Sequence, residues 1–294
     1  MFEGFTSHDV TVPGGHVHVR MAGSGPPVLL LHGYPQTHAI WHRTAPAIAG
    51  AGWQVICADL PGYGRSSIPP LEDVEHYTKR AMANALVQAM EALGHARFRV
   101  VGHDRGARVA YRMTLDHPGR IAQLATLDVQ PTLETFEKLG RAGGLAAYHW
   151  FFLAQKHPLP ERLIGADPEW FLRWTLDSWV GSGSAFDEEA FADYRASFLQ
   201  PDRLRASCND YRAGATLDCE HDRLDRDAGR KIGCPMLALW GAGAGGAASD
   251  GPVLQTWRRW ATNVRGAGLP CGHFIPEEAP EALLAALLPF LRAG

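Results

Sequence analysis

The chain has few of the features that mark secreted, membrane-bound or disulfide-rich proteins. Its five cysteines are odd in number and form no C-x-x-C pair, which fits a reducing cytoplasm better than a disulfide scaffold. No window approaches the roughly 18 uninterrupted apolar residues of a membrane span. The first residues lack the basic and apolar regions of a signal peptide. We therefore expect a cytoplasmic protein without a membrane segment.

An excess of charge of one sign is also missing. The net charge of −3 is too small to suggest binding to nucleic acid or to a membrane surface, and no basic stripe is interleaved with aromatic residues. We expect no nucleic-acid partner and no membrane partner. Apolar residues make up 46% of the 294 residues, which is typical of a globular protein with a large core.

Short apolar runs alternate with helical patterns along most of the chain. Buried strands are expected at 28–32, 55–59, 98–102, 124–128 and 236–240, with a more alternating edge strand at 15–21. Helices are expected at 77–93, 105–115 and 280–291. This order predicts an α/β fold with a doubly wound, mostly parallel sheet.

The segment from about Gln130 to Ser207 interrupts this alternation. It contains no convincing buried strand, but it is rich in aromatic residues with helical patterns. Such helices could simply pack on the sheet, or they could cover the carboxyl ends of the strands, where ligands bind in open α/β sheets. Because the segment directly follows a strand, we favour a cap. The predicted division is a core at 1–129, a helical cap at 130–207 and the rest of the core at 208–294.

The most informative motif lies where a buried strand meets a helix. Gly102 and Gly106 flank Asp104 in a G-x-D-x-G pattern, the form of a nucleophile elbow, in which small neighbours permit a sharp turn. A carboxylate is ionised at neutral pH and suits displacement at a saturated carbon through a covalent ester. The alternative is that Asp104 only caps the helix. We favour the nucleophile, because the order of the following motifs also matches.

A carboxylate nucleophile of this kind needs a histidine and a second acid later in the chain. His273 lies in a late loop before the final helix and is the candidate base that activates water. Asp128, at the end of a predicted strand, is the preferred acid, and Asp250 is the alternative. As a purely structural residue, Asp128 would cap a turn.

Other groups near the elbow could bind charge. The backbone N–H groups of Tyr34 and Arg105 could stabilise an oxyanion. Arg105 and Arg108 lie three residues apart at the start of one helix, and two guanidinium groups beside a catalytic carboxylate favour an anionic substrate. The alternative is a pair of surface arginines in salt bridges.

Two further patterns lead to no site. The segment 241–246 matches G-x-G-x-x-G, but no acidic residue follows about 20 positions later, so a dinucleotide site is not expected. Cys219, His221 and Asp222 do not have zinc-ligand spacing. We therefore predict neither a cofactor nor a metal.

Taken together, these motifs resemble the fluoroacetate (haloacetate) dehalogenase family of α/β hydrolases. The resemblance runs through residues 32–38, 59–64, 102–108, 148–150, 210–214 and 272–278. It implies hydrolysis of a small haloacid with water, in a homodimer. It also implies Asp104 as nucleophile, His273 as base and Asp128 as its acid, with Arg105 and Arg108 on the substrate carboxylate. The residues similar to the family's halide pocket are His149, Trp150 and Tyr211.

The sequence departs from this family in places and leaves other functions open. Tyr34 stands where phenylalanine is expected, and the segment 241–246 is richer in glycine than expected. An epoxide hydrolase would share the ester mechanism and need two cap tyrosines, for which Tyr148, Tyr194 and Tyr211 are available. The two arginines argue against a neutral epoxide. A non-catalytic ligand-binding relative would have lost its nucleophile, acid or base, and an aspartate at the elbow excludes a serine esterase.

Overall fold

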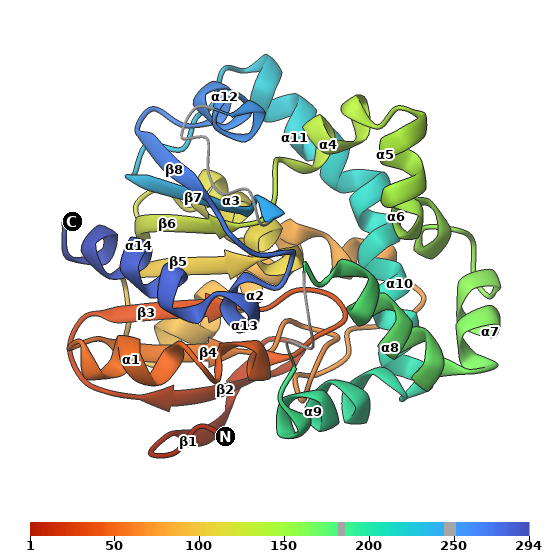
Figure 1. The fold of residues 1–294 in the computed structure, drawn as a ribbon, viewed down its shortest axis with the longest axis horizontal. Helices are drawn as coiled ribbons and strands as arrows, with labels where there is room; N and C mark the ends of the chain where they lie inside the picture. Colours follow the sequence, from red (N-terminus) through yellow and green to blue (C-terminus); the bar gives the residue numbers. More distant parts are fainter. Residues whose placement is uncertain (182–185, 244–250, 294) are drawn as a thin grey trace.

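The structure is a computed structural model that describes residues 1–181, 186–243 and 251–293. An eight-stranded sheet forms one side of the molecule, and a layer of helices covers the ends of its central strands (Figure 1). The strands lie in the order β1-β2-β4-β3-β5-β6-β7-β8. Pairs β1–β2 and β2–β4 are antiparallel, and the other neighbours are parallel. The predicted α/β fold with a mostly parallel sheet is therefore confirmed.

Six of the eight strands lie close to the expected ranges, and the bounds of all eight follow. They are β1 (Thr6–Val12), β2 (Gly15–Ala22), β3 (Pro27–Leu31), β4 (Gln54–Ala58), β5 (Phe98–His103), β6 (Ile121–Leu127), β7 (Met236–Gly241) and β8 (Val264–Leu269).

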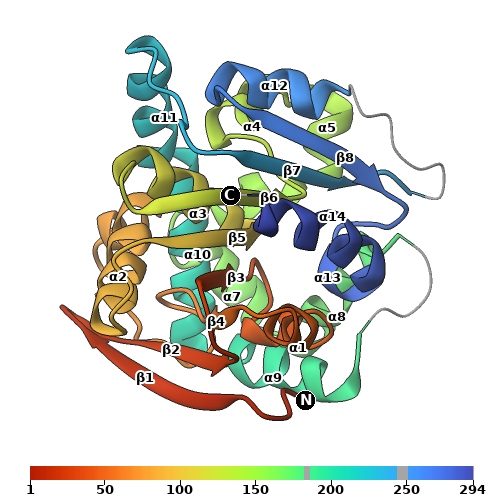
Figure 2. The same ribbon diagram turned by 90° about the vertical axis from the view of Figure 1, so that its left-hand side faces the viewer.

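Helices cover both faces of the sheet, because central strands such as β3 carry apolar side chains on both sides. Along β3, Val28 and Leu30 pack on one face, whereas Leu29 and Leu31 pack on the other. Helices α1 and α14 lie on the first face, and α2 and α3 lie on the second (Figure 2). The core helices are η1 (His38–Trp41), α1 (Ala45–Gly50), η2 (Val74–Tyr77), α2 (Lys79–Ala92), α3 (Arg105–Asp116), α12 (Pro252–Trp260), α13 (Ile275–Glu278) and α14 (Pro280–Arg292).

The helical insertion between β6 and β7 forms the layer at the carboxyl ends of the parallel strands (Figure 1). Its members are α4 (Thr132–Lys138), α5 (Arg141–Ala146), α6 (Tyr148–Leu153), α7 (Leu159–Gly165), α8 (Pro168–Trp179), α9 (Glu188–Phe198), α10 (Pro201–Ala215) and α11 (Leu217–Asp227). The predicted boundary at 207/208 lies inside α10, so the helical segment runs further than 130–207. The continuous helix crosses that boundary because no glycine or proline interrupts residues 202–213.

Two strands were not expected from the sequence. In β1 most side chains are exposed, so a buried apolar pattern is missing. Strand β8 contains Gly266 and Gly268, which weaken its strand pattern. A Cβ atom at Gly266 would lie 1.9 Å from the carbonyl oxygen of Ala238 in β7. Gly266 therefore makes β8 hard to predict from the sequence, and it also allows the backbones of β7 and β8 to pair closely.

Candidate active site

The sharp turn between β5 and α3 presents Asp104 above the sheet. Asp104 has a positive φ of 45°, a conformation that costs energy in a non-glycine residue. A Cβ atom at Gly102 would lie 2.5 Å from Ala107, and one at Gly106 would lie 2.3 Å from the carbonyl oxygen of His32. The two glycines of the motif are therefore required by close backbone contacts, and together they permit the turn.

The carboxylate of Asp104 does not cap the helix that follows it. Its side chain makes no capping hydrogen bond to α3. Instead, the backbone N–H of Tyr34 donates to Asp104 Oδ1 at 3.0 Å. Burial raises the pKa of Asp104, but the positive charges of His273 and Arg105 outweigh burial and lower it below its ordinary value. The carboxylate is thus ionised, with Oδ1 held by an amide and Oδ2 on the side of His273.

His273 is oriented by Asp128, as the preferred assignment of the acid requires. His273 Nδ1 lies 2.6 Å from Asp128 Oδ2, and the backbone N–H of Gly241 donates to Asp128 Oδ1 at 3.0 Å. His273 Nε2 lies 4.0 Å from Asp104 Oδ2, too far for a hydrogen bond. Burial lowers the pKa of His273, but the hydrogen bond and charge of Asp128 raise it above 6.5. The alternative acid, Asp250, lies outside the described residues.

The two arginines have different surroundings. Arg105 is buried and forms a bidentate ion pair with Asp210, through Nε to Oδ2 and Nη2 to Oδ1, both at 2.8 Å. Arg108 is also buried, but its Nη1 donates only to neutral acceptors, the carbonyl oxygen of Gln130 and the hydroxyl of Thr132. Its Nε has no hydrogen-bond partner among the described residues. Within the described ranges, Arg108 is thus a buried cation without a carboxylate partner.

A cavity of about 320 Å³ joins these groups and lies at the small end of the range for ligand sites. Nine residues line it: Asp104, Arg108, Asp128, Ala146, Ala147, His149, Trp150, Trp179 and His273. Arg105 is not part of this lining. Its Cζ lies 5.9 Å from the ring of Trp150, which lines the cavity, and 4.2 Å from the ring of Tyr211, which does not.

Of the three residues compared with a halide pocket, His149 and Trp150 line the cavity, whereas Tyr211 is not part of its lining. Tyr211 contacts both His149 and Trp150, with ring centroids 5.8 and 6.4 Å apart. Burial lowers the pKa of His149 to about 3, so its imidazole is neutral at pH 7. His149 Nδ1 is buried and has no partner among the described residues. The indole of Trp150 lies under Arg108, 4.3 Å from its Cζ.

Two residues of the site were given no role from the sequence, and the structure adds a consequence to the Tyr34 departure noted there. Trp179 lines the cavity, and its carbonyl oxygen accepts a hydrogen bond from the backbone N–H of His273. Only its place among other cap aromatics pointed to it. Asp210 was noted as part of a motif, without a role. The hydroxyl of Tyr34 is buried and has no partner in the described part of the chain, so the departure from phenylalanine leaves an unsatisfied polar group.

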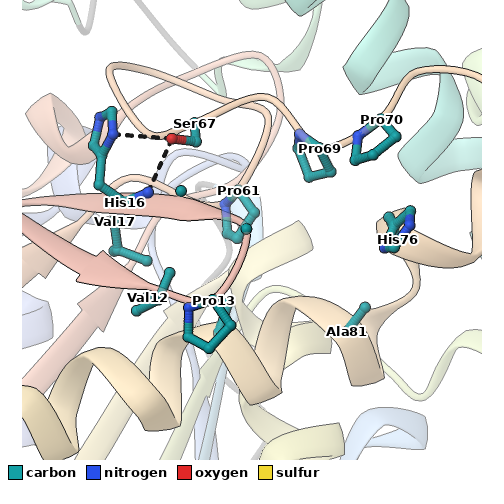
Figure 3. A pocket seen from close by; sticks show the side chains of 13 residues that line it. Val12, Pro13, His16, Val17, Pro61, Ser67, Pro69, Pro70, His76 and Ala81 are labelled. Carbon is teal, nitrogen blue, oxygen red and sulfur yellow. Dashed lines mark hydrogen bonds between the residues drawn. The ribbon is translucent and has the colours of Figure 1, made fainter.

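One further cavity and one histidine–aspartate cluster in the described part of the chain lack comparable chemistry. A cavity of about 430 Å³ between β1, β2 and α2 is lined mainly by proline and small apolar side chains, and its lining contains no carboxylate in the described structure (Figure 3). The cluster His18, His38 and Asp59 has a ligand-like composition. However, Asp59 already accepts hydrogen bonds from the backbone and ring of His38 and from the backbone of Arg65. These bonds explain the cluster as structural.

In the loose group Cys219, His221 and Asp222, two of the three residues have hydrogen-bond partners outside the group. Cys219 contacts the carbonyl oxygen of Gly214, and Asp222 accepts hydrogen bonds from Tyr111 and Arg112. Its members therefore do not converge on a shared metal position. The G-x-G-x-x-G segment 241–246 lies partly outside the described residues.

The fold and this site define a hydrolase. The model for the alpha/beta hydrolase fold matches residues 26–280, and the chain belongs to this family. It is 43% identical to a fluoroacetate dehalogenase from Burkholderia sp. over 99% of this chain and 95% of the relative, which confirms the resemblance expected from the motifs. It is 32% identical to a soluble epoxide hydrolase from Corynebacterium sp. (strain C12), over 97% and 96%.

A solved structure gives the same result. The crystal structure of ALR0039 from Nostoc sp. PCC 7120, a protein assigned to the α/β hydrolases, superimposes with a TM-score of 0.93 at 47% identity, covering 99% of each chain. Within the described ranges, no helix is both long enough and apolar enough to cross a bilayer.

The hydrogen bond between His273 and Asp128 leads to a prediction about protonation. Replacing Asp128 by asparagine (Asp128→Asn) removes the negative charge that favours the imidazolium form, so the pKa of His273 should fall below that of the wild type. NMR titration of the histidine ring resonances measures this change. Asp116→Asn, which changes a carboxylate paired with Arg80, is the matched control. An unchanged His273 titration in Asp128→Asn would contradict the assigned pair.

Proposed function

We propose that the protein is a hydrolytic dehalogenase that converts small 2-haloacids, such as fluoroacetate or chloroacetate, to 2-hydroxy acids. The observation that carries this proposal is Arg108, a buried guanidinium that has no carboxylate partner in the described structure and lines the same cavity as Asp104. A buried cation of this kind is stabilised by an anionic ligand. The similarity to a fluoroacetate dehalogenase supports the same substrate class.

In the first step, Asp104 Oδ2 attacks the carbon that carries the halogen. A carbon–oxygen ester bond forms, the carbon–halogen bond breaks, and the halide leaves with the bonding electron pair. Asp104 Oδ1 remains on the Tyr34 amide, so Oδ2 is the oxygen available for attack. We assign the substrate carboxylate to Arg108 and Arg105. Donors from His149, Trp150 and Tyr211 would stabilise the departing halide.

In the second step, water attacks the carbonyl carbon of the ester. His273 Nε2 takes a proton from the water, while Asp128 stabilises the imidazolium that forms. The Tyr34 amide, joined by the backbone N–H of Arg105, would stabilise the oxyanion. Collapse of the intermediate releases the 2-hydroxy acid and restores the Asp104 carboxylate, which keeps the water oxygen. Because the base must be neutral, hydrolysis should decline as pH falls through the raised pKa of His273.

The positions of the cap tyrosines support an epoxide hydrolase less well than a dehalogenase, because an epoxide hydrolase needs two tyrosines that donate to the substrate. Tyr194 is buried and donates to Glu277 Oε1 at 3.0 Å, so its hydroxyl is engaged elsewhere. Tyr148 packs on the ring of Trp174, with centroids 5.9 Å apart. Tyr211 alone of the three contacts His149 and Trp150 together. A non-catalytic role is also disfavoured, because nucleophile, base and acid are all present and close together.

The proposed activity is tested by halide release. Purified protein should release halide and glycolate in equal amounts from chloroacetate or fluoroacetate. Asp104→Asn should lower kcat by at least about 1,000-fold, because the variant lacks the ionised nucleophile. Asp227→Asn, which changes an exposed carboxylate on α11, should leave the activity unchanged. Absence of halide release from every 2-haloacid tried, with turnover of an epoxide instead, would refute the proposal.

The role of Arg108 gives a second kinetic prediction. Arg108→Gln should raise KM for chloroacetate by roughly 30-fold or more, since loss of one partner of a buried charge pair costs about 2 kcal/mol or more. The neutral isostere chloroacetamide should be affected much less. An equal loss for both substrates would show that Arg108 supports the fold rather than the substrate charge.

We also propose that the protein forms a homodimer through the outer side of the cap. Several large apolar side chains of α5–α8 are exposed there, and exposed apolar groups of this kind often mark protein interfaces. They are Leu145, Phe151, Leu159, Leu163, Trp170 and Trp174. The helices that carry them lie on the side of the molecule away from the sheet (Figure 1).

Light scattering during size-exclusion chromatography tests this surface. The wild type should be dimeric, and the double variant Leu163→Lys/Trp170→Lys should be monomeric, because both side chains are more than half exposed in the single chain, at 59% and 60%. Leu224→Lys, on α11 outside this group, is the matched control and should remain dimeric. A monomeric wild type, or a double variant that stays dimeric, would contradict the proposed interface.

A further inference from the structure

A buried network of charges lies behind Arg105. Asp210, on α10, has no exposed surface, and its carboxylate takes two of the Arg105 nitrogens, Nε and Nη2. Its carbonyl oxygen also accepts a hydrogen bond from Nη2 at 2.9 Å. Three of the five N–H donors of this guanidinium are therefore committed to one residue. Nη1 makes none of these bonds to Asp210.

Two further residues, Lys79 and Tyr63, also hold the carboxylate of Asp210. Lys79 Nζ, at the first residue of α2, forms an ion pair with Asp210 Oδ1, and the hydroxyl of Tyr63 donates to Oδ2 at 2.7 Å. Lys79 also binds Asp218 on α11, where Nζ lies 3.1 Å from Oδ2. Two cations and two carboxylates thus balance one another within the buried network. Four helices contribute to it: α2, α3, α10 and α11.

The balance matters because Arg105 directly follows Asp104 in the chain. Within the described residues, the cation in ion-pair range of the Asp104 carboxylate is His273, whose Nε2 lies 4.0 Å from Oδ2. The charge of Arg105 already contributes to lowering the pKa of Asp104, so a guanidinium released from Asp210 would be drawn to this carboxylate. An ion pair between them would cover the nucleophile and withdraw the charge of Arg105 from an anionic ligand.

We infer that Asp210 is a positioning residue for anion recognition. Supported by Lys79 and Tyr63, it fixes the guanidinium plane of Arg105, keeps it away from Asp104 and leaves Nη1 for the ligand carboxylate. Arg108, whose partners are neutral, supplies the uncompensated charge. The inference rests on the proposed function for the identity of the ligand as a small carboxylate.

The test compares binding of glycolate and of its neutral isostere glycolamide by calorimetry, so that turnover is not needed. Wild-type protein should bind glycolate more tightly. Asp210→Asn should weaken glycolate binding by roughly tenfold, in line with loss of a charge-assisted hydrogen bond, and leave glycolamide binding unchanged. Asp225→Asn removes another buried carboxylate, which pairs with Arg112 on the same side of the fold, and should change neither ligand.

If Asp210→Asn does not fold, a milder variant tests the role of Asp210. Tyr63→Phe removes one hydrogen bond to Asp210 Oδ2 but keeps the ring, and should weaken glycolate binding by roughly two- to threefold. Unchanged or tighter glycolate binding in the folded variants, equal weakening of both ligands, or no preference for glycolate in the wild type would overturn the inference. Glycolate binding that depends on Asp210 in a protein that releases no halide would instead refute only the proposed reaction.

Discussion

The strained turn at Asp104 is the constraint on which the rest of the site depends. Its positive φ directs the carboxylate away from the helix that it would otherwise cap. The turn exists only because Gly102 and Gly106 allow the backbone to pass within contact distance of its neighbours. A carboxylate presented in this way has one oxygen on the Tyr34 amide and the other facing His273. Nucleophile and base are therefore held apart by geometry, with neither neutralising the other.

Electrostatics divides the buried charges of the site into two groups. Arg105, Asp210, Lys79 and Asp218 compensate one another and act as a rigid support. Arg108 is left uncompensated beside the cavity. In a low-dielectric site an unpaired charge costs much more than in water. The unpaired charge of Arg108 is unfavourable in the protein without a ligand. An anionic ligand would pair with this charge, so the site favours anions over neutral ligands.

Local patterns in the sequence predicted the fold class and placed the main side chains. The predicted elbow, His273 and Asp128 do lie together, because the topology of the sheet brings the carboxyl ends of β5 and β6 side by side. The partner of Arg105 could not be predicted, since Asp210 lies 105 residues away on a helix that was partly assigned to the core. Strand β8 was missed because the glycine that permits its pairing also weakens its strand pattern. The Arg105–Asp210 ion pair and the pairing of β8 both depend on contacts between distant parts of the chain, which local sequence propensity does not encode.

The central claim is that Asp104 forms and then loses an ester. Single turnover of chloroacetate with excess enzyme in ¹⁸O-labelled water, followed by mass analysis of the peptide that contains Asp104, tests it most directly. The account predicts that the label enters the Asp104 carboxylate, while the glycolate formed carries an unlabelled oxygen from the enzyme. Labelled glycolate together with an unlabelled Asp104 peptide would mean that water attacks the substrate itself, and would contradict the account.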